Sequence, residues 1–306
     1  MFIEAIEVSG FGGLGALDLA LERTTKVSGS GRALVAFQDA LALAFSAWDP
    51  TILQGLLTRW GCTGVVIEGA AAPEGAHWES APGLSGVLDP KGDGLLTVGL
   101  RIALDPPQFG RLRQLSTRDP RLVDALADGA RLRVRTGARF SPALDALAID
   151  PLGFVIGEEV FPIAGAERPS WMTSFLSGLR GRLQIGGVAG EVWGARAASY
   201  KATDRRALQR GLAALSTGPA NLGEVVALPE GPAAFVGEEL VSVRHLGPGA
   251  RAAAGIVGAV HLSGAEILLV EPGAEWVEWL TSQAEADNSA LEQVILVGAP
   301  GGVVLA

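Results

Sequence analysis

The first twenty residues alternate between apolar and polar side chains, which is the pattern of half-buried strands. Two such runs occupy residues 2–8 and 14–21, and the glycine-rich segment 10–13 separates them. Glycine supplies the backbone freedom that a tight turn requires. The pattern therefore predicts an antiparallel hairpin at the start of the chain.

A strand, a glycine loop and a helix are predicted next. Residues 24–28 favour a short strand, and Gly29-Ser30-Gly31 interrupts it. Over residues 33–47, large apolar side chains recur at steps of three and four, which is the spacing of one face of an α-helix. Together these segments predict a strand, a loop and a helix in direct succession.

The middle of the chain mixes strand and helix patterns. Strands are predicted over residues 63–68, 95–104, 130–136 and 144–149, with turns at 90–94 and 150–153. Helices are predicted near residues 51–60, 107–116, 119–127, 169–180 and 202–215. The turn at 150–153 is expected because Asp, Pro and Gly occur together there, ahead of a short strand.

Short, fully apolar runs alternate with helices in the last third. Such runs are typical of parallel strands that are buried on both faces. The predicted strands cover residues 224–228, 234–236, 267–270, 291–297 and 303–305, and the predicted helices cover 249–260 and 274–286. The patterns together predict an α/β fold, with a mixed sheet, flanking helices and an antiparallel N-terminal β region.

Composition narrows the class of protein. The chain has 306 residues, a formal net charge of −9 and 48% hydrophobic residues, so it is expected to fold and to have little affinity for bulk nucleic acid. A single cysteine, Cys62, excludes a disulfide framework and a cysteine-based zinc site, and three scattered histidines predict no metal cluster. No apolar run reaches the ~18–20 residues of a membrane span, and the N-terminus lacks a signal-peptide pattern. A cytoplasmic location without membrane contact is therefore predicted.

Five short motifs follow one another in a defined order. A strand, a turn with Phe11 and a second strand open the chain, and the glycine loop then leads into a helix containing Asp39-Ala40-Leu41. Near the C-terminus, Leu246-Gly247-Pro248-Gly249 opens a helix, Glu271-Pro272 ends one apolar strand and Gly298 ends another.

In this order and spacing the chain resembles the ATPase head of the SMC/RecF-like branch of the ABC-type P-loop ATPases, without the coiled-coil arm. The resemblance covers both ends of the chain. It implies a single ATPase-head-like domain over residues 1–306, in which the middle third, about residues 85–200, is an inserted β/α subdomain. It also implies a role in genome maintenance or in defence against foreign DNA.

The residues that carry catalysis in that family are absent from the matching positions. A phosphate loop needs a lysine for the terminal phosphates and a hydroxyl group for magnesium. Aligned on Asp39-Ala40-Leu41, Leu34 takes the lysine position and Val35 the hydroxyl position, and no lysine of the chain is followed by Ser or Thr. Gly29, Ser30, Gly31 and Arg32 are therefore interpreted as a degenerate phosphate loop.

Three further catalytic elements are degenerate. Glu271 alone remains where the family has two acids before the proline. Gly247 replaces the signature serine, and Gly298 and Ala299 occupy the position of the switch histidine. The sequence thus predicts a pseudo-ATPase that keeps the fold, has lost hydrolysis and uses no cofactor or metal.

Two alternatives remain open for these motifs. One is an unrelated α/β protein that carries the apolar run before Glu271-Pro272 by chance. The other is a divergent ATPase or nucleotide-dependent switch that a partner completes. Only the second alternative would bind ATP with magnesium.

Arginines form a strip in the middle of the chain. Arg131, Arg133 and Arg135 alternate with apolar residues, which places them on one face of a strand. Residues 101–140 hold nine arginines and four aspartates. A DNA-binding module that contacts the phosphate backbone is therefore a third hypothesis, and a solvated strand face explains the same pattern.

Charge and aromatic residues near the C-terminus suggest a protein partner. Residues 252–306 contain seven acids and no lysine or arginine, so this region is expected to dock on a basic strip of another subunit, in a homodimer or a heteromeric complex. Scattered surface charge is the alternative. Trp276 and Trp279 lie three residues apart on a predicted helix, where they serve either as interface anchors or as core residues.

Overall fold

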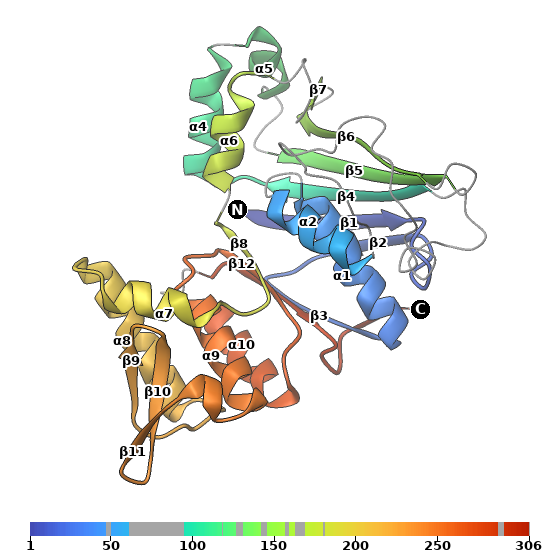
Figure 1. Ribbon diagram of the computed structural model, residues 1–306. Helices are drawn as coiled ribbons and strands as arrows, with labels where there is room; N and C mark the ends of the chain where they lie inside the picture. The colour runs from blue at the N-terminus through green and yellow to red at the C-terminus, as the bar shows by residue number, and fades with distance from the viewer. Residues whose placement is uncertain are drawn as a thin grey trace. The chain divides into compact units, whose positions relative to one another are not determined.

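The computed structural model describes residues 1–46, 50–60, 95–117, 119–126, 131–141, 146–156, 159–162, 169–179, 181–286 and 291–305. The chain divides into two compact units (Figure 1). Unit 1 comprises Met1–Glu22, Ser28–Arg180 and Val303–Ala306, and unit 2 comprises Arg23–Val27 and Gly181–Gly302. The strand predicted at 63–68 and the turn predicted at 90–94 lie outside the described residues.

Unit 1 is built on an antiparallel sheet with the strand order β2-β1-β4-β5-β6-β7. The strands are β1 (Phe2–Ser9), β2 (Leu17–Ala20), β4 (Leu95–Ala103), β5 (Arg131–Ser141), β6 (Ala146–Ile156) and β7 (Glu159–Pro162). The predicted N-terminal hairpin is confirmed, because β1 pairs with β2 from Ala5↔Ala20 to Val8↔Leu17. One face of the sheet is fully buried at Ile6, Leu100 and Ile102. Helix α1 (Gly31–Phe45) packs on β4 and β5, and α2 (Pro50–Arg59) packs on α1.

The turn predicted at residues 150–153 is wrong, because these residues lie inside the continuous strand β6. Arg135 of β5 is paired with Gly153, and Gly137 is paired with Asp150, so Pro151 and Leu152 oppose a single residue. This is a β-bulge, a position that tolerates a proline because the ladder hydrogen bond is already lost there. The cluster of turn-forming residues therefore marks a bulge in a strand.

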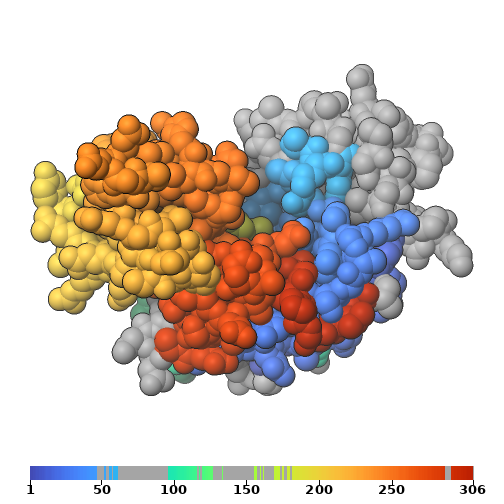
Figure 2. Space-filling model, turned by 90° about the horizontal axis from the view of Figure 1, so that it is seen from below, coloured from blue at the N-terminus to red at the C-terminus, as the bar shows by residue number. Residues whose placement is uncertain are grey.

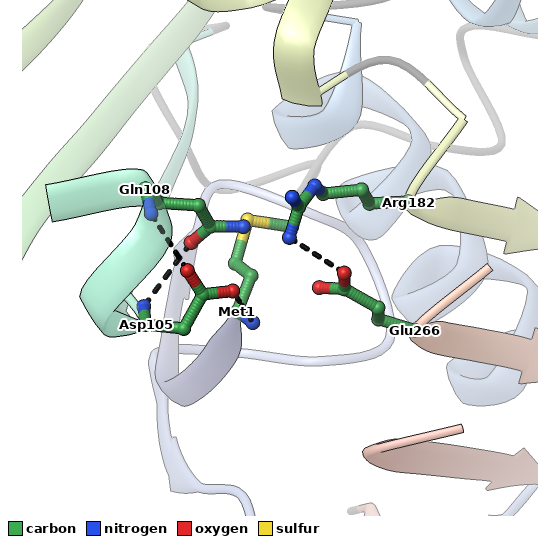
Figure 3. A network of polar contacts seen from close by, with 5 residues as sticks. All are labelled: Met1, Asp105, Gln108, Arg182 and Glu266. Atoms are coloured by element: carbon green, nitrogen blue, oxygen red, sulfur yellow. Dashed lines mark hydrogen bonds and ion pairs between the residues drawn. The ribbon is translucent and has the colours of Figure 1, made fainter. Parts of the chain in front are cut away.

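Three further helices belong to unit 1: α4 (Pro106–Ser116), α5 (Pro120–Ala125) and α6 (Met172–Leu179). Helix α4 begins with a capping box, in which the Gln108 N–H donates to Asp105 Oδ1 at 2.7 Å and the Asp105 N–H donates to Gln108 Oε1 at 3.2 Å (Figure 3). The ammonium group of Met1 lies 3.1 Å from Asp105 Oδ2. The same carboxylate thus caps α4 and holds the start of β1.

Asp119 joins α5 to α6 in a similar way. Its carboxylate caps α5, accepts a hydrogen bond from Trp171 Nε1 at 3.2 Å and pairs with Arg121 at 3.2 Å. Although burial acts to raise it, the hydrogen bonds from Arg121 and Trp171 leave the pKa of Asp119 below its usual value. The charged carboxylate is therefore the stable form in the folded protein.

Unit 2 is built on parallel strands, as the apolar runs predict. The sheet has the order β14-β3-β13-β12-β8, with β3 (Thr24–Gly29), β13 (Gln293–Val297), β12 (Ile267–Val270), β8 (Leu183–Ile185) and β14 (Val303–Leu305). Strand β14 and the last two residues of β3 are assigned to unit 1. The pairs β3–β13, β13–β12 and β12–β8 are all parallel. Every residue of β12 and β13 is buried. Helix α9 (Pro248–His261) packs on β12, and α10 (Ala274–Glu285) packs on β13.

A polar contact secures the edge strand β8. Arg182 Nη1 lies 2.5 Å from Glu266 Oε1 (Figure 3), and the Arg182 carbonyl accepts hydrogen bonds from the Glu266 and Ile267 N–H groups at 2.8 and 2.9 Å. The two strands β8 and β12 are thereby fixed in register at their N-terminal ends.

A second sheet of unit 2 is antiparallel, with the order β11-β10-β9. Its strands are β9 (Val225–Leu228), β10 (Gly231–Val236) and β11 (Glu239–Ser242), and beside it lie α7 (Gly190–Ala197), α8 (Ala202–Thr217) and the 3-10 helix η2 (Val243–His245). The sequence pattern missed α7, in which glycine lowers helix propensity. A Cβ atom at Gly194 would lie 1.7 Å from the Pro229 carbonyl oxygen, so close packing against the loop before β10 requires glycine there.

Among the helices that the structure describes, none is both long enough and apolar enough to cross a bilayer.

Candidate functional site

The segment that aligns with a phosphate loop is a one-residue connection. Strand β3 ends at Gly29 and helix α1 begins at Gly31, so only Ser30 lies between them. The Ser30 side chain accepts a hydrogen bond from the Ala33 N–H at 3.2 Å, and the Ser30 carbonyl accepts one from the Leu34 N–H at 3.0 Å. The Leu34 bond is the first regular bond of the helix, whereas the Ala33 N–H is one of the free amides that a phosphate-binding helix start offers to its ligand, and here the Ser30 side chain occupies it.

The C-terminal strand lies directly against this connection. A Cβ atom built on Gly29, whose φ is +152°, would lie 2.8 Å from the Leu305 carbonyl oxygen and 3.1 Å from Leu305 Cβ. The Ser28 hydroxyl donates to the Val303 carbonyl at 3.4 Å, and the Leu305 side chain is buried. Strand β14 therefore fills the space on this side of Gly29.

The side chains of the first helical turn do not replace a phosphate loop. Leu34 and Val35, at the lysine and hydroxyl positions, are aliphatic, and Val35 is 55% exposed. The aliphatic stem of Arg32 lies against the hairpin turn, since a Cβ on Gly13 would be 3.1 Å from Arg32 Cγ. An aliphatic pair at these positions neither balances phosphate charge nor binds magnesium.

Asp39, on which the alignment rests, has a structural role in unit 1. The Trp60 Nε1–H donates to Asp39 Oδ2 at 2.8 Å, and Arg59 Nη2 lies 2.9 Å from Asp39 Oδ1. Burial raises the pKa of Asp39 above its ordinary value, and the contacts with Trp60 and Arg59 oppose this shift. The carboxylate thus ties α1 to the end of α2.

The strands that carry the other motif remnants end at one edge of the parallel sheet. Val27 is paired with Val297 and Val270 with Leu296, so Glu271 lies level with Val27, with β13 between them. At ~4.8 Å per strand, the two backbones are roughly 10 Å apart. Val270, where the family has its first acid, is 5% exposed and belongs to the core of unit 2. Glu271 is exposed at this edge.

The donor set for a metal ion is incomplete. Within the described ranges, no group of three or more His, Cys, Asp or Glu side chains is arranged to hold a metal. Glu271, the acid before Pro272, is therefore not part of such a group.

The signature-like segment opens a helix, as predicted. Gly247 is the N-cap of α9 with φ +113°, Pro248 occupies the first helical position, and no side chain caps the helix. Leu246 ends the 3-10 helix η2, and Gly249 lies in the first turn of α9. Only glycine adopts the backbone angle of residue 247 without strain, so the conformation of this residue favours glycine over serine.

Gly298, at the position that aligns with the switch histidine, has no side chain and contributes a backbone hydrogen bond. Gly298 has a φ of +78°, and its N–H donates to the Val27 carbonyl at 2.7 Å. This hydrogen bond connects the end of β13 to the end of β3. Ala299 is buried in the core of unit 2.

The predicted arginine strip lies on β5, in the interior of the six-stranded sheet. Arg133 is exposed and is paired with Arg101 of β4, which itself lies 3.1 Å from Asp18 and 3.6 Å from Glu7. The side chains of Arg131 and Arg135 lie outside the described part of the structure. Glu7 and Asp18 therefore balance the charge of Arg101, the residue paired with Arg133 of the strip.

The two tryptophans of α10 pack inside unit 2. Trp276 is 3% exposed and lies in the hydrophobic core, and Trp279 packs against it edge-on with ring centroids 5.3 Å apart. Trp279 also contacts the ring of His261 at 6.1 Å. Burial and the nearby Arg210 lower the pKa of His261 to about 4, so this histidine is neutral at pH 7.

One charged surface was missed by the sequence reasoning. Helix α8 presents Arg205, Arg206 and Arg210 to solvent, and Tyr200 precedes it with 91% of its side chain exposed. The sequence indicates this surface by five basic residues between positions 196 and 210, with a single acid among them.

Comparison with known proteins gives similarity to solved structures alone. No protein-family model and no curated protein sequence matches the chain. The chain is similar to an Smc head bound to the C-winged helix domain of ScpA, with a TM-score of 0.49 and 11% identity over 98% of this chain and 90% of that one.

Two other similar structures are larger than this chain. An Smc head domain with a coiled coil and joint from Pyrococcus yayanosii has a TM-score of 0.30 and 13% identity, and 72% of this chain covers 36% of it. The recombination mediator protein RecF with ATP, from the RecFOR pathway, has a TM-score of 0.25 and 10% identity, and 72% of this chain covers 40% of it. The chain spans less than half the length of these two proteins.

Proposed function

We propose that this protein is a nucleotide-independent binding protein with the fold of an ATPase head, which acts as a scaffold or regulator in a complex for genome maintenance or defence. The observation that carries the proposal is the connection between β3 and α1. Ser30 alone forms it, caps α1 with its own side chain, and is followed by aliphatic residues at the lysine and hydroxyl positions.

Nucleotide binding at this connection would require existing contacts to break, and no residue present would supply new contacts to the phosphates in their place. The hydrogen bond from the Ala33 N–H to the Ser30 side chain, worth about 1 kcal/mol, would have to break before this N–H could reach a phosphate. On the side of Gly29 where a Cβ would project, the Leu305 carbonyl leaves no room for a ligand unless strand β14 moves. A triphosphate would then meet Leu34 and Val35 instead of a cation and a magnesium-bound hydroxyl.

The proposal is tested by thermal unfolding with and without MgATP. A ligand at a hundred times its Kd stabilises the native state by about 2.7 kcal/mol, which moves the Tm by several degrees. We expect 2 mM MgATP, roughly two hundred times a Kd of 10 µM, to leave the Tm within a degree of the Tm in MgCl2 with a non-nucleotide salt. A saturable rise in Tm would refute the proposal.

Phosphate release from ATP is the second measurement, because an enzyme that needs a partner protein would show no change in Tm when the chain is tested alone. Release is measured on the purified chain and on the chain with its co-purifying proteins, with Glu271→Gln as the matched variant. We expect the same background rate for both forms. Release that depends on Glu271 would establish the alternative, an ATP-dependent switch.

A further inference from the structure

Unit 2 exposes a basic surface on α8. The exposed positions of this helix recur at steps of three and four and include Arg205, Arg206 and Arg210, whereas Gly211 and Leu215 face inward and are buried. Within the residues that the structure describes, none of these three arginines forms an ion pair.

The one acid of this segment is already engaged. Asp204 pairs with Arg196 and accepts a hydrogen bond from the Ser199 hydroxyl at 2.6 Å. This hydrogen bond, followed by the charges of Arg196 and Lys201, lowers the pKa of Asp204. The arginines on the exposed face of α8 therefore keep their charge unneutralised by their own helix, and Tyr200 places an exposed aromatic ring beside them.

The hairpin of β10 and β11 is also exposed, but its charged residues are acidic. Residues 235–240 are all exposed, and Phe235 is paired with Leu240 across the hairpin, so the two side chains share one face. Each of these two side chains is 42% exposed. Glu238 lies in the two-residue turn and Glu239 directly after it. The hairpin thus presents an apolar pair on one face and two carboxylates at its tip, of which Glu239, paired with Val236, lies on the opposite face from the apolar pair.

One occupant accounts for both surfaces. A nucleic acid would neutralise the arginines of α8 but would leave the apolar pair and the carboxylates of the hairpin without an occupant. A second copy of this chain offers a basic aromatic face to the hairpin and an acidic apolar hairpin to α8. Both features belong to unit 2 and are exposed on the face that Figure 2 shows, with the α8 segment in yellow and the hairpin in orange.

We propose that two copies of this chain associate through unit 2, with the β10–β11 hairpin of each copy on α8 of the other. A twofold axis makes the contact twice and closes the assembly, whereas a single head-to-tail contact would generate open chains. The association needs neither a nucleotide nor the β3–α1 connection, so it stands or falls separately from the proposed function.

The test is a charge exchange between copies, measured by sedimentation velocity at roughly 1–100 µM protein. The two variants are Arg205→Glu/Arg206→Glu and Glu238→Lys/Glu239→Lys. We expect the natural chain to dimerise, and each variant alone to dissociate with a Kd raised about tenfold or more, because like charges then meet at both contacts. Mixed in equal amounts, the two variants restore opposite charges at both contacts and form a heterodimer.

The matched control is Glu278→Lys/Glu285→Lys, which changes the net charge equally at exposed positions of α10 and is expected to dimerise as the natural chain does. Circular dichroism and the Tm establish that each variant is folded. A monomeric natural chain, variants that dimerise unchanged, or a mixture that stays monomeric would each overturn the proposal. So would a monomer whose salt-sensitive binding to a labelled oligonucleotide is lost in Arg205→Glu/Arg206→Glu, because the surface would then bind nucleic acid.

Discussion

Helices α1 and α9 begin in different ways, although each has a glycine with a positive φ within two residues before its start. Helix α1 begins behind Ser30, whose side chain caps it, and strand β14 packs on the preceding Gly29. Helix α9 begins behind Gly247 with a proline at its first position and no side-chain cap, and a Cβ on Gly247 would meet nothing within 4 Å.

The two helix starts differ in how the surrounding chain uses them. At α1 the chain uses the helix start for its own stability, through the Ser30 cap and the packing of β14 on Gly29. At α9 the space around Gly247 is open and no side chain caps the helix. The comparison teaches that a glycine before a helix serves close packing in one place and an unusual backbone angle in the other.

The largest expected effect comes from Gly29→Ala. The added methyl group would collide with the Leu305 carbonyl at 2.8 Å in a backbone conformation that favours glycine, so we expect a loss of roughly 2–4 kcal/mol in the free energy of unfolding. Urea denaturation measures it. Gly31→Ala is the matched control, since its Cβ meets nothing within 4 Å, and it should change stability by less than about 0.5 kcal/mol. Equal effects of the two substitutions would show that β14 does not close this connection.

The histidine at the C-terminal end of α9 predicts that the stability of the protein depends on pH. His261 ends this helix with a pKa lowered from 6.5 to about 4, so between these values the unfolded chain binds a proton that the folded chain does not. Stability should therefore fall as the pH falls from 6.5 towards 4, by roughly 1–2 kcal/mol for this partly buried group. Comparing the natural chain with His261→Gln in urea at pH 7 and pH 5 measures it. The same pH dependence in both proteins would contradict the prediction.

Removal of the cap on α1 has a smaller expected effect. Ser30→Ala leaves the Ala33 N–H without its partner and should cost about 1 kcal/mol of stability. Ser30→Asp keeps an acceptor at the same place and adds a favourable charge at the helix start, so it should retain the stability of the natural chain. If Ser30→Ala is as stable as Ser30→Asp, the cap does not occupy the helix start in solution.

The smallest expected effect is that of restoring the missing side chains. Leu34→Lys/Val35→Thr supplies the cation and the hydroxyl group, yet Ser30 still caps the helix and β14 still packs against Gly29. We expect MgATP to leave the Tm of this double variant within a degree of its value without nucleotide. A clear ATP-dependent rise would show that composition alone, and not packing, closes the connection.

The sequence predicted well those elements whose pattern is local. The hairpin at the N-terminus, the helix after Gly31 and the buried strands β12 and β13 follow from alternation, from the spacing of three and four, and from continuous apolar runs. It failed where packing overrides local preference. Pro151 lies in a strand because a bulge accommodates it, and Gly194 lies in a helix because a loop backbone passes against it.

The sequence by itself determines which side chains the candidate site contains, whatever fold the chain adopts. A chain without a cation at residue 34, a hydroxyl group at residue 35 or a second acid before Pro272 carries that deficit in every conformation, since no folding step changes a side chain. Only the tertiary structure decided that β14 covers Gly29, because this contact brings together segments from opposite ends of the chain, whereas the cap of Ser30 on its own helix is a local contact over three residues. It also decided which charges stay exposed: Asp204 is engaged by its neighbours, whereas the arginines of α8 face solvent.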